Sequence, residues 1–271
     1  MFSFWRKRSA ETEEGATNQS NRGPLRLSVV GCGDAFGSGG RLQTSFHVAL
    51  PDTQFLIDCG ATALIGLQRL ALNPNDVDTI VLSHLHGDHY AGLVWWIMHA
   101  QYVSGRIAPL TVIGPEGTRE RYLAAAEVLF PGSTSVEPSF DVHFQVYREH
   151  EAFEALGFSV KPFPVSHPSG ALSSALRIEA GGRVIAFSGD TEWKDELLGC
   201  SAEADLFICE CFGYRDKEHY HMSWSDIEAK LPELTARKIL LTHLGEKMLA
   251  NVEQVRQPRV DVADDGMIID L

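Results

Sequence analysis

The stretch TIVLSHLHGDH, residues 79–89, decides how this 271-residue chain folds and where its chemistry lies. Its apolar start is typical of a buried strand, and polar residues follow where that strand should end. Alternation along an extended segment places His84 and His86 on one side, and the turn after them lets Asp88 and His89 face a second position. Imidazole nitrogens with a carboxylate oxygen are typical zinc ligands in catalytic sites, so the stretch predicts two neighbouring metals.

Three later residues strengthen this interpretation. His167 follows the strand-like run FSVKPFPV, Asp190 ends RVIAFSGD, and His243 ends KILLTH. Each lies at the carboxyl end of an apolar run, where open α/β folds gather their sites. Taken singly, each of these three is equally well a hydrogen-bonded core or loop residue. For the first stretch, the alternative is a set of surface or capping polar residues, with Asp88 capping the next helix. Together they favour metal binding.

The rest of the chain predicts an α/β protein. Residues 1–24 are polar and without apolar period, so we predict a flexible tail before one domain over residues 25–271. From Leu25 onward, short apolar runs alternate with helical patterns, and near-continuous apolar strands indicate sheets covered by helices on both faces. The predicted strands are 25–31, 54–60, 79–84, 110–114, 158–165, 174–180, 183–190, 205–210 and 238–243, and the predicted helices are 61–71, 89–102, 116–130, 193–198, 223–231 and 246–254.

Composition narrows the classes of function. The five cysteines form no CxxC pair, which favours reduced, mostly buried thiols over disulfides. A net charge of −13 argues against a broad nucleic-acid-binding face, which needs many Lys and Arg contacts to phosphate. No apolar run is long enough for a membrane span, and the start MFSFWRKRS lacks the apolar core of a secretory signal. The predicted location is the cytoplasm, without membrane association.

Taken in order, these motifs resemble the metallo-β-lactamase superfamily. The HxHxDH block at 84–89, the later histidine, SGDT at 188–191 and LTH at 241–243 carry the resemblance, which extends from Leu25 to the C-terminus. It implies a four-layer αββα sandwich holding two Zn²⁺, with Mn²⁺ or Fe²⁺ as alternatives. The implied ligands are His84, His86 and His167 for one zinc, and Asp88, His89 and His243 for the other, with Asp190 bridging them.

Within that superfamily, the chain is most similar to the ribonuclease Z-like phosphodiesterase branch. The Gly-rich segment GCGDAFGSGGRLQTSF at 31–46 and GP at 114–115 carry this likeness, and the glycines are expected to form a turn lining the floor of the site. The resemblance implies that Glu210 and His221 act together near the leaving group, beside Asp88. Cys209 replaces a histidine usual in the branch, and His219 is a second candidate for the proton donor.

The leading function is therefore a dinuclear zinc hydrolase that cleaves small or short phosphodiesters through a metal-bridging hydroxide. The alternatives are hydrolysis of an ester, thioester, lactone or lactam, and a non-catalytic metal-binding protein. Ribonuclease Z enzymes of this branch bind transfer RNA through an extended basic insertion. The segment between Gly114 and His167 of this chain has too few Lys and Arg residues to form such an insertion. The expected partner is a small-molecule substrate rather than a long nucleic acid, and the resemblance is compatible with a homodimer.

Overall fold

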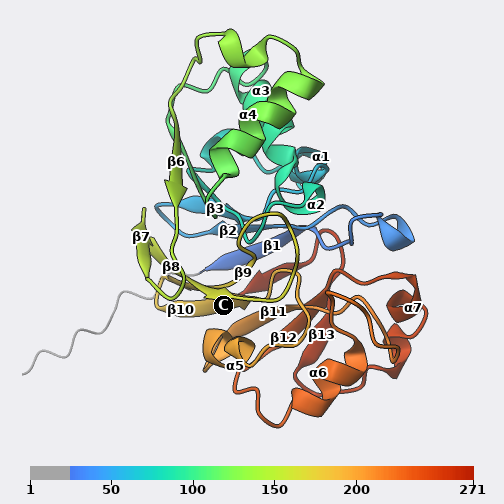
Figure 1. Ribbon diagram of the computed structural model, residues 1–271. Coiled ribbons are helices and arrows are strands. Elements are labelled where there is room, and N and C mark those ends of the chain that lie inside the picture. The colour runs from blue at the N-terminus through green and yellow to red at the C-terminus, as the bar shows by residue number, and fades with distance from the viewer. Residues whose placement is uncertain (1–24) are drawn as a thin grey trace, which may run out of the picture.

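Two seven-stranded mixed sheets lie face to face at the centre of the molecule, as a computed structural model shows for residues 25–271 (Figure 1). The first sheet has the order β14 (Ile268–Asp270), β1 (Arg26–Gly31), β2 (Ser45–Ala49), β3 (Gln54–Ile57), β4 (Thr79–Val81), β5 (Leu110–Gly114) and β6 (Val142–Val146). The second has the order β13 (Val260–Val262), β12 (Ile239–Thr242), β11 (Leu206–Glu210), β10 (Arg183–Phe187), β9 (Ser174–Ala180), β8 (Phe158–Pro164) and β7 (Phe153–Ala155). The predicted tail, residues 1–24, lies outside the described part of the chain.

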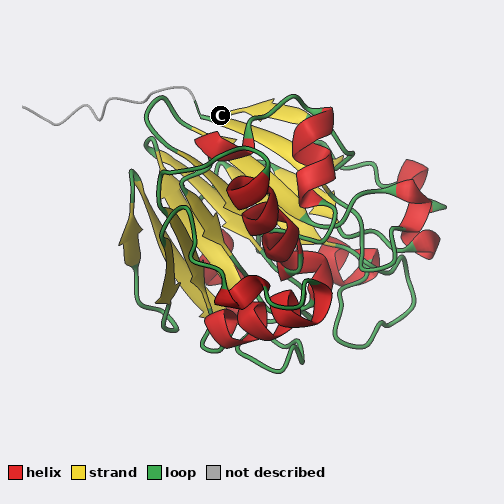
Figure 2. Cartoon of the chain, turned by 90° about the horizontal axis from the view of Figure 1, so that it is seen from above, coloured by secondary structure: helices red, strands yellow, loops and turns green. Residues whose placement is uncertain are grey.

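Helices cover the outer face of each sheet. The first sheet carries α1 (Ala63–Arg69), α2 (Gly87–Tyr90), α3 (Gly92–Tyr102) and α4 (Thr118–Leu129), and the second carries α5 (Glu196–Ser201), α6 (Trp224–Lys230) and α7 (Glu246–Leu249) (Figure 1). Figure 2 shows helices lying across the strands of the sheet behind them. The predicted αββα sandwich is confirmed.

Three apolar clusters lie between the four layers. Each sheet packs one face on the other sheet and the opposite face on its helices, so both faces are buried. Between the sheets, Phe55 stacks on Phe158 with ring centroids 4.0 Å apart, and Phe46 meets Phe187 edge-on. Separate clusters join each sheet to its own helices. All residues of β4 and β11 are buried, which explains their near-continuous apolar sequences.

Most predicted elements are present, with three corrections at helices. The predicted helix 89–102 is two helices, α2 and α3, separated at Ala91. The predicted helix 193–198 was misplaced, since α5 begins only at Glu196. The predicted helix 246–254 ends at Leu249 and is followed by a 3-10 turn over Val252–Gln254. Short helices of this kind depend on tertiary packing, which periodicity alone does not reveal.

Five strands were missed: β2, β6, β7, β13 and β14. Three of them have only three residues each, and β7, β13 and β14 lie at sheet edges. Such segments form strands because a neighbour supplies hydrogen bonds, not because of a strong apolar pattern of their own.

The structure describes all five cysteine side chains. All five thiols are free and buried, as predicted. Within residues 25–271, no helix combines the length and the apolar character needed to cross a membrane.

Candidate metal centre

The seven predicted metal ligands converge on one edge of the sandwich, although they come from separate parts of the chain. His84 and His86 lie between β4 and α2, and Asp88 and His89 lie in α2. The other three follow strand ends of the second sheet, after β8, β10 and β12; they are His167, Asp190 and His243. Strands that run in the same direction end at the same edge of a sheet, which brings these side chains together.

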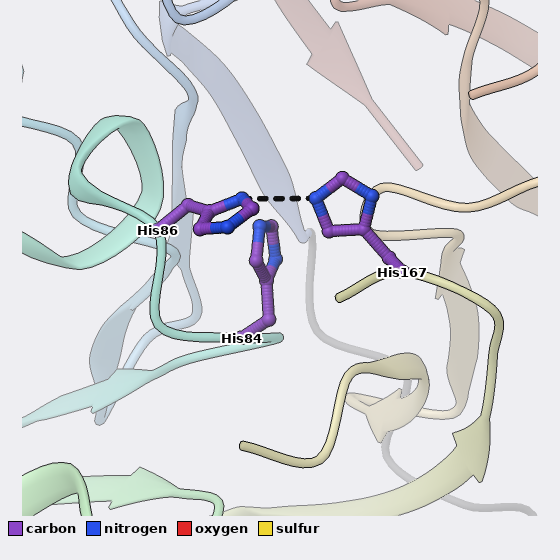
Figure 3. A group of neighbouring side chains, drawn as sticks. All are labelled: His84, His86 and His167. Atoms are coloured by element: carbon purple, nitrogen blue, oxygen red, sulfur yellow. Dashed lines mark hydrogen bonds between the residues drawn. The ribbon is translucent and has the colours of Figure 1, made fainter. Parts of the chain in front are cut away.

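The first group consists of His84, His86 and His167. Their candidate ligand atoms all lie within 4.8 Å of one another. Figure 3 shows the three imidazoles turned toward one another, with His86 Nδ1 2.9 Å from His167 Nε2. This is the grouping that the resemblance implied for one metal.

The second group consists of Asp88, His89, Asp190 and His243, all of them buried and also within 4.8 Å of one another. His89 Nε2 lies 3.2 Å from Asp190 Oδ1 and 3.3 Å from Asp88 Oδ2. Asp190 Oδ2 lies 3.4 Å from His243 Nε2 and 3.8 Å from the Nε2 atoms of both His84 and His167. Asp190 therefore lies between the two groups.

Several polar atoms of the two groups make no hydrogen bond to the described residues, and these atoms show whether a cation fits. His84 Nε2, His89 Nε2 and Asp190 Oδ1 are buried without a hydrogen bond. Burying such atoms unpaired costs roughly 1–3 kcal/mol each. A set of imidazole nitrogens and carboxylate oxygens with unused lone pairs fits divalent metals, zinc in particular.

Hydrogen bonds donated from Nδ1 leave the lone pairs of His84 and His167 on Nε2. Ser83 Oγ donates to Asp58 and therefore accepts from His84 Nδ1, 3.0 Å away. In the same way, His167 Nδ1 donates to the carbonyl of Tyr220 at 2.9 Å. Fixing the tautomer through the second ring nitrogen is how proteins orient metal-binding histidines.

Charges around the centre keep its carboxylates ionised. Burial would raise the pKa of Asp190, but the neighbouring His243 and His89 hold it well below its ordinary value. Burial would lower the pKa of His89, but Asp190, Asp88 and Asp58 together raise it well above the ordinary value. In His84, burial and the charge of His89 both lower the pKa. Without a metal, the centre thus combines ionised carboxylates with a neutral His84 and a protonated His89, and metal binding would displace the His89 proton.

Asp58 belongs to this centre and was missed by the sequence analysis. It follows β3 in a left-handed conformation (φ 57°) and is fully buried. Its Oδ2 accepts from His89 Nδ1 at 2.6 Å, and its Oδ1 accepts from the Ser83 amide at 2.7 Å. The signal was present, because an aspartate that ends the apolar run QFLI repeats the pattern of Asp190.

The predicted pair Glu210 and His221 lies beside the two groups. Glu210 is buried at the end of β11, and its Oε1 is 3.2 Å from His221 Nδ1. The His221 ring centroid is 5.0 Å from that of His167 and 5.4 Å from that of His243. Burial would lower the pKa of His221, but the hydrogen bond and charge of Glu210 raise it to about 9.

The other residues that the sequence singled out near this pair point elsewhere. His219 is exposed and does not line the cavity at the centre. Cys209 is buried among apolar residues of the second sheet and α6. The geometry therefore brings His221, and not His219, to the two ligand groups.

A cavity of about 320 Å³ opens over the two groups. Its walls include Ala35 and Phe36 from the Gly-rich loop, together with Phe212 and His221. The loop thus lines the site, as its glycines had indicated.

Comparison with known proteins places this chain in a family. Residues 25–263 match the family model described as Anti-Pycsar protein Apyc1. The chain belongs to the Apyc1 family. Among curated proteins, this Apyc1-family chain is 31% identical over 229 residues to the uncharacterized protein Rv1339 of Mycobacterium tuberculosis, covering 81% of each chain. It is 24% identical over 297 residues to ribonuclease Z of Clostridium acetobutylicum, covering 85% of this chain and 93% of that protein.

Solved structures agree with this placement of the Apyc1-family chain. The crystal structure of the metallo-β-lactamase fold protein YhfI from Bacillus subtilis matches with a TM-score of 0.75 at 23% identity, covering 92% of this chain and all of that one. The predicted membership of the metallo-β-lactamase superfamily, with a ribonuclease Z-like character, is confirmed. The chain is accordingly a metal-dependent hydrolase with a cluster of His and Asp side chains suited to divalent metal.

Proposed function

We propose that this protein is a dinuclear zinc phosphodiesterase acting on small or short phosphodiesters. The observation that carries the proposal is the pair of adjoining ligand groups that lie beneath one cavity, with Asp190 between them. His84, His86 and His167 would hold one zinc, and Asp88, His89 and His243 the other. Bound zinc supplies a water of lowered pKa and stabilises negative charge on substrate oxygens.

The residues around the metals have separate roles in this proposal. Asp190 lies between the groups and keeps them at a bridging separation. His221 faces the same cavity, and Glu210 holds it through Nδ1, which leaves its other nitrogen available to protonate a leaving oxygen. Asp88 is proposed to act as a ligand whose loss disables the site.

Small substrates fit the site better than long RNA does. The cavity measures about 320 Å³, near the lower end for small-molecule sites. Between Gly114 and His167 the basic residues are Arg119, Arg121, Arg148 and Lys161. Arg121 donates to the carbonyls of Leu85 and Ser169, so its guanidinium already has partners within the fold.

RNA is nevertheless the substrate class that the name of the ribonuclease Z relative suggests. Ester, thioester, lactone or lactam hydrolysis is a further alternative, because the same ligands support both chemistries. A non-catalytic metal-binding role, a cytoplasmic location and a homodimer also stay predictions.

The direct test is hydrolysis of bis(p-nitrophenyl) phosphate by protein of measured zinc content. We expect metal-dependent turnover that Asp88→Ala abolishes and that Asp52→Ala, at an exposed loop position, leaves intact. Parallel assays should use ester and lactam substrates and a transfer RNA precursor. Turnover of only the ester or lactam panel would replace the proposal with the rival hydrolase, and no turnover by zinc-loaded protein would favour the binding role.

A further inference from the structure

The first ligand group is assembled from two segments that belong to different sheets. His84 and His86 follow β4 of the first sheet, and His167 follows β8 of the second (Figure 3). Both segments lie beyond the ends of their strands, so their carbonyl groups need hydrogen-bond partners other than a neighbouring strand. The separation of the two segments decides whether the three imidazoles can bind one metal, because zinc requires nitrogen ligands at about 2.0–2.1 Å.

One guanidinium group reaches both segments. Arg121 Nη1 donates to the carbonyl of Leu85 at 3.0 Å and to the carbonyl of Ser169 at 2.9 Å. Leu85 is the residue between the first two histidines of the group, and Ser169 follows His167 by two positions. Hydrogen bonds from a charged donor are stronger than those between neutral groups. Arg121 therefore connects the two segments through a single nitrogen atom.

The loop after His167 links the position of Ser169 to that of the imidazole. The His167 carbonyl accepts from the Ser169 amide at 3.1 Å and from the Ser173 hydroxyl at 2.8 Å. The hydroxyls of the two serines are 2.9 Å apart, and both side chains are buried. Gly170 has a left-handed conformation (φ 74°) and lets the guanidinium come close, because a Cβ there would lie 2.9 Å from Arg121 Nη2. The guanidinium thus packs against a loop whose internal hydrogen bonds restrict His167.

The backbone of Arg121 is fixed in the first sheet's half of the molecule. Arg121 lies in the first turns of α4, and its amide donates to the carbonyl of Gly117 at 2.9 Å. The start of the helix is anchored by Thr118, whose buried hydroxyl donates to the carbonyl of Pro115 at 2.6 Å. The helix itself packs against α3 and β6. The side chain therefore extends from a fixed base in one half to a loop of the other half.

Other contacts position the second ligand group. His89 Nδ1 donates to Asp58 Oδ2 at 2.6 Å, and the His243 amide donates to the carbonyl of Cys32 at 2.9 Å. These two partners lie directly after β3 and β1, and α4 supplies neither of them. Loss of the Arg121 guanidinium is therefore expected to affect the two metals unequally.

We propose that Arg121 is a positioning residue for the metal of the first ligand group, because its guanidinium sets the separation of the two segments that carry the three histidines. This role rests on the proposed dinuclear centre and deepens it. The affinity for one of the two metals would depend on a residue of α4 whose hydrogen bonds go to backbone carbonyls rather than to ligand side chains. A role limited to stabilising the fold would instead affect both metals alike.

Competition for zinc between the protein and a chelator of known affinity measures the two zinc equivalents of the wild type. His86→Ala identifies the equivalent bound by the first group, and His243→Ala identifies the other. We expect Arg121→Met to weaken the first equivalent about tenfold or more, because methionine keeps an apolar stem but donates no hydrogen bond, and to leave the second unchanged. Arg119→Met, at an exposed arginine of the same helix, is the matched control and should bind both equivalents as the wild type does.

A conservative variant tests whether the two hydrogen bonds cause the effect. Both bonds come from one nitrogen, so the Nζ of lysine can donate them from a side chain that is one atom shorter. We expect Arg121→Lys to recover part of the zinc affinity that Arg121→Met loses. If Arg121→Met does not fold, Arg121→Gln takes its place with the same expectation, since glutamine keeps a polar group but is too short to reach both carbonyls.

The outcomes separate this inference from the proposed function. If the wild-type protein binds fewer than two zinc ions, the dinuclear centre itself is wrong. If it binds two, and the Arg121 variant weakens both equally or neither, the positioning role is wrong. Equal zinc affinities of the lysine and methionine variants would show that the hydrogen bonds to Leu85 and Ser169 do not cause the effect, which also overturns the inference.

Discussion

Asp58 shows how a residue outside the ligand groups controls them. It accepts hydrogen bonds from His89 and from Ser83, and Ser83 in turn lies against His84. One buried carboxylate therefore orients a histidine of each ligand group. Hydrogen-bond partners of this kind fix the orientation of a metal-binding imidazole and raise the basicity of its ligating nitrogen.

We predict that Asp58→Asn weakens zinc binding about 10- to 100-fold, because an amide cannot accept from both His89 and Ser83 with the charge of a carboxylate. Competition for zinc with a chelator of known affinity measures the effect. Asp52→Asn, an exposed aspartate before β3, is the matched control. Equal zinc affinity of the Asp58 variant and the wild type would contradict the orienting role.

His221 and His219 make a matched pair for testing the proton donor, since they lie two residues apart and only His221 contacts Glu210. We predict that His221→Ala lowers kcat about 100-fold on thymidylyl-(3′→5′)-thymidine, whose alkoxide leaving group needs a proton. The loss should be much smaller on bis(p-nitrophenyl) phosphate, whose leaving group is stable as an anion. His219→Ala should resemble the wild type on both substrates, and equal losses on both substrates for His221→Ala would exclude a proton donor.

At the scale of elements, close approach between layers constrains the small residues of the helices. α1 packs against β1 through Gly66, where a Cβ would lie 2.6 Å from Val30 Cγ1 and closer still to the Val30 carbonyl oxygen. In α5, a Cβ at Gly199 would meet only Phe163 Cε1 at 3.4 Å, an ordinary contact. The two glycines have the same local helix preference but different tertiary surroundings.

The same substitution at these glycines should therefore have opposite effects. We predict that Gly66→Ala lowers the free energy of unfolding by roughly 1–3 kcal/mol, because the helix must move away from the sheet. Gly199→Ala should raise it by up to about 1 kcal/mol through helix propensity. Urea denaturation followed by circular dichroism gives both values, and a stabilised Gly66→Ala protein would show that α1 packs less closely than described.

At the scale of the whole molecule, the candidate metal centre connects the two halves of the sandwich. His84, His86, Asp88 and His89 belong to the half built on the first sheet, whereas His167, Asp190 and His243 follow strands of the second. Each ligand group takes residues from both halves. Metal binding should therefore stabilise the packing of one half on the other as well as the site itself.

We predict that removing the metals with EDTA lowers the Tm by on the order of 10 °C, because a ligand at about 1,000 times its Kd contributes roughly 4 kcal/mol. Added zinc should restore the original Tm. Differential scanning calorimetry measures the shift, and Asp88→Ala, which lacks one ligand of the second group, should show a smaller one. A Tm that is unchanged by EDTA, in protein shown to have lost its metal, would mean that the centre does not couple the two halves.

The sequence alone determined the layers and most of the site. Near-continuous apolar runs such as those at β4 and β11 predicted buried strands, because a sheet covered on both faces needs apolar side chains on both. The order of the histidine and aspartate motifs predicted which side chains would meet, and the structure places all seven ligand candidates together.

Only the tertiary structure decided what depends on neighbours distant in sequence. It formed β7, β13 and β14 at sheet edges, where pairing partners compensate for weak patterns. It brought Asp58 to His89 across 31 residues, and it turned His221 rather than His219 toward Glu210. It also placed Phe36 and Phe212, which are 176 positions apart, in the walls of the cavity over the ligand groups. A local pattern specifies which residues face the core, but the contacts between loops depend on how the whole sandwich closes.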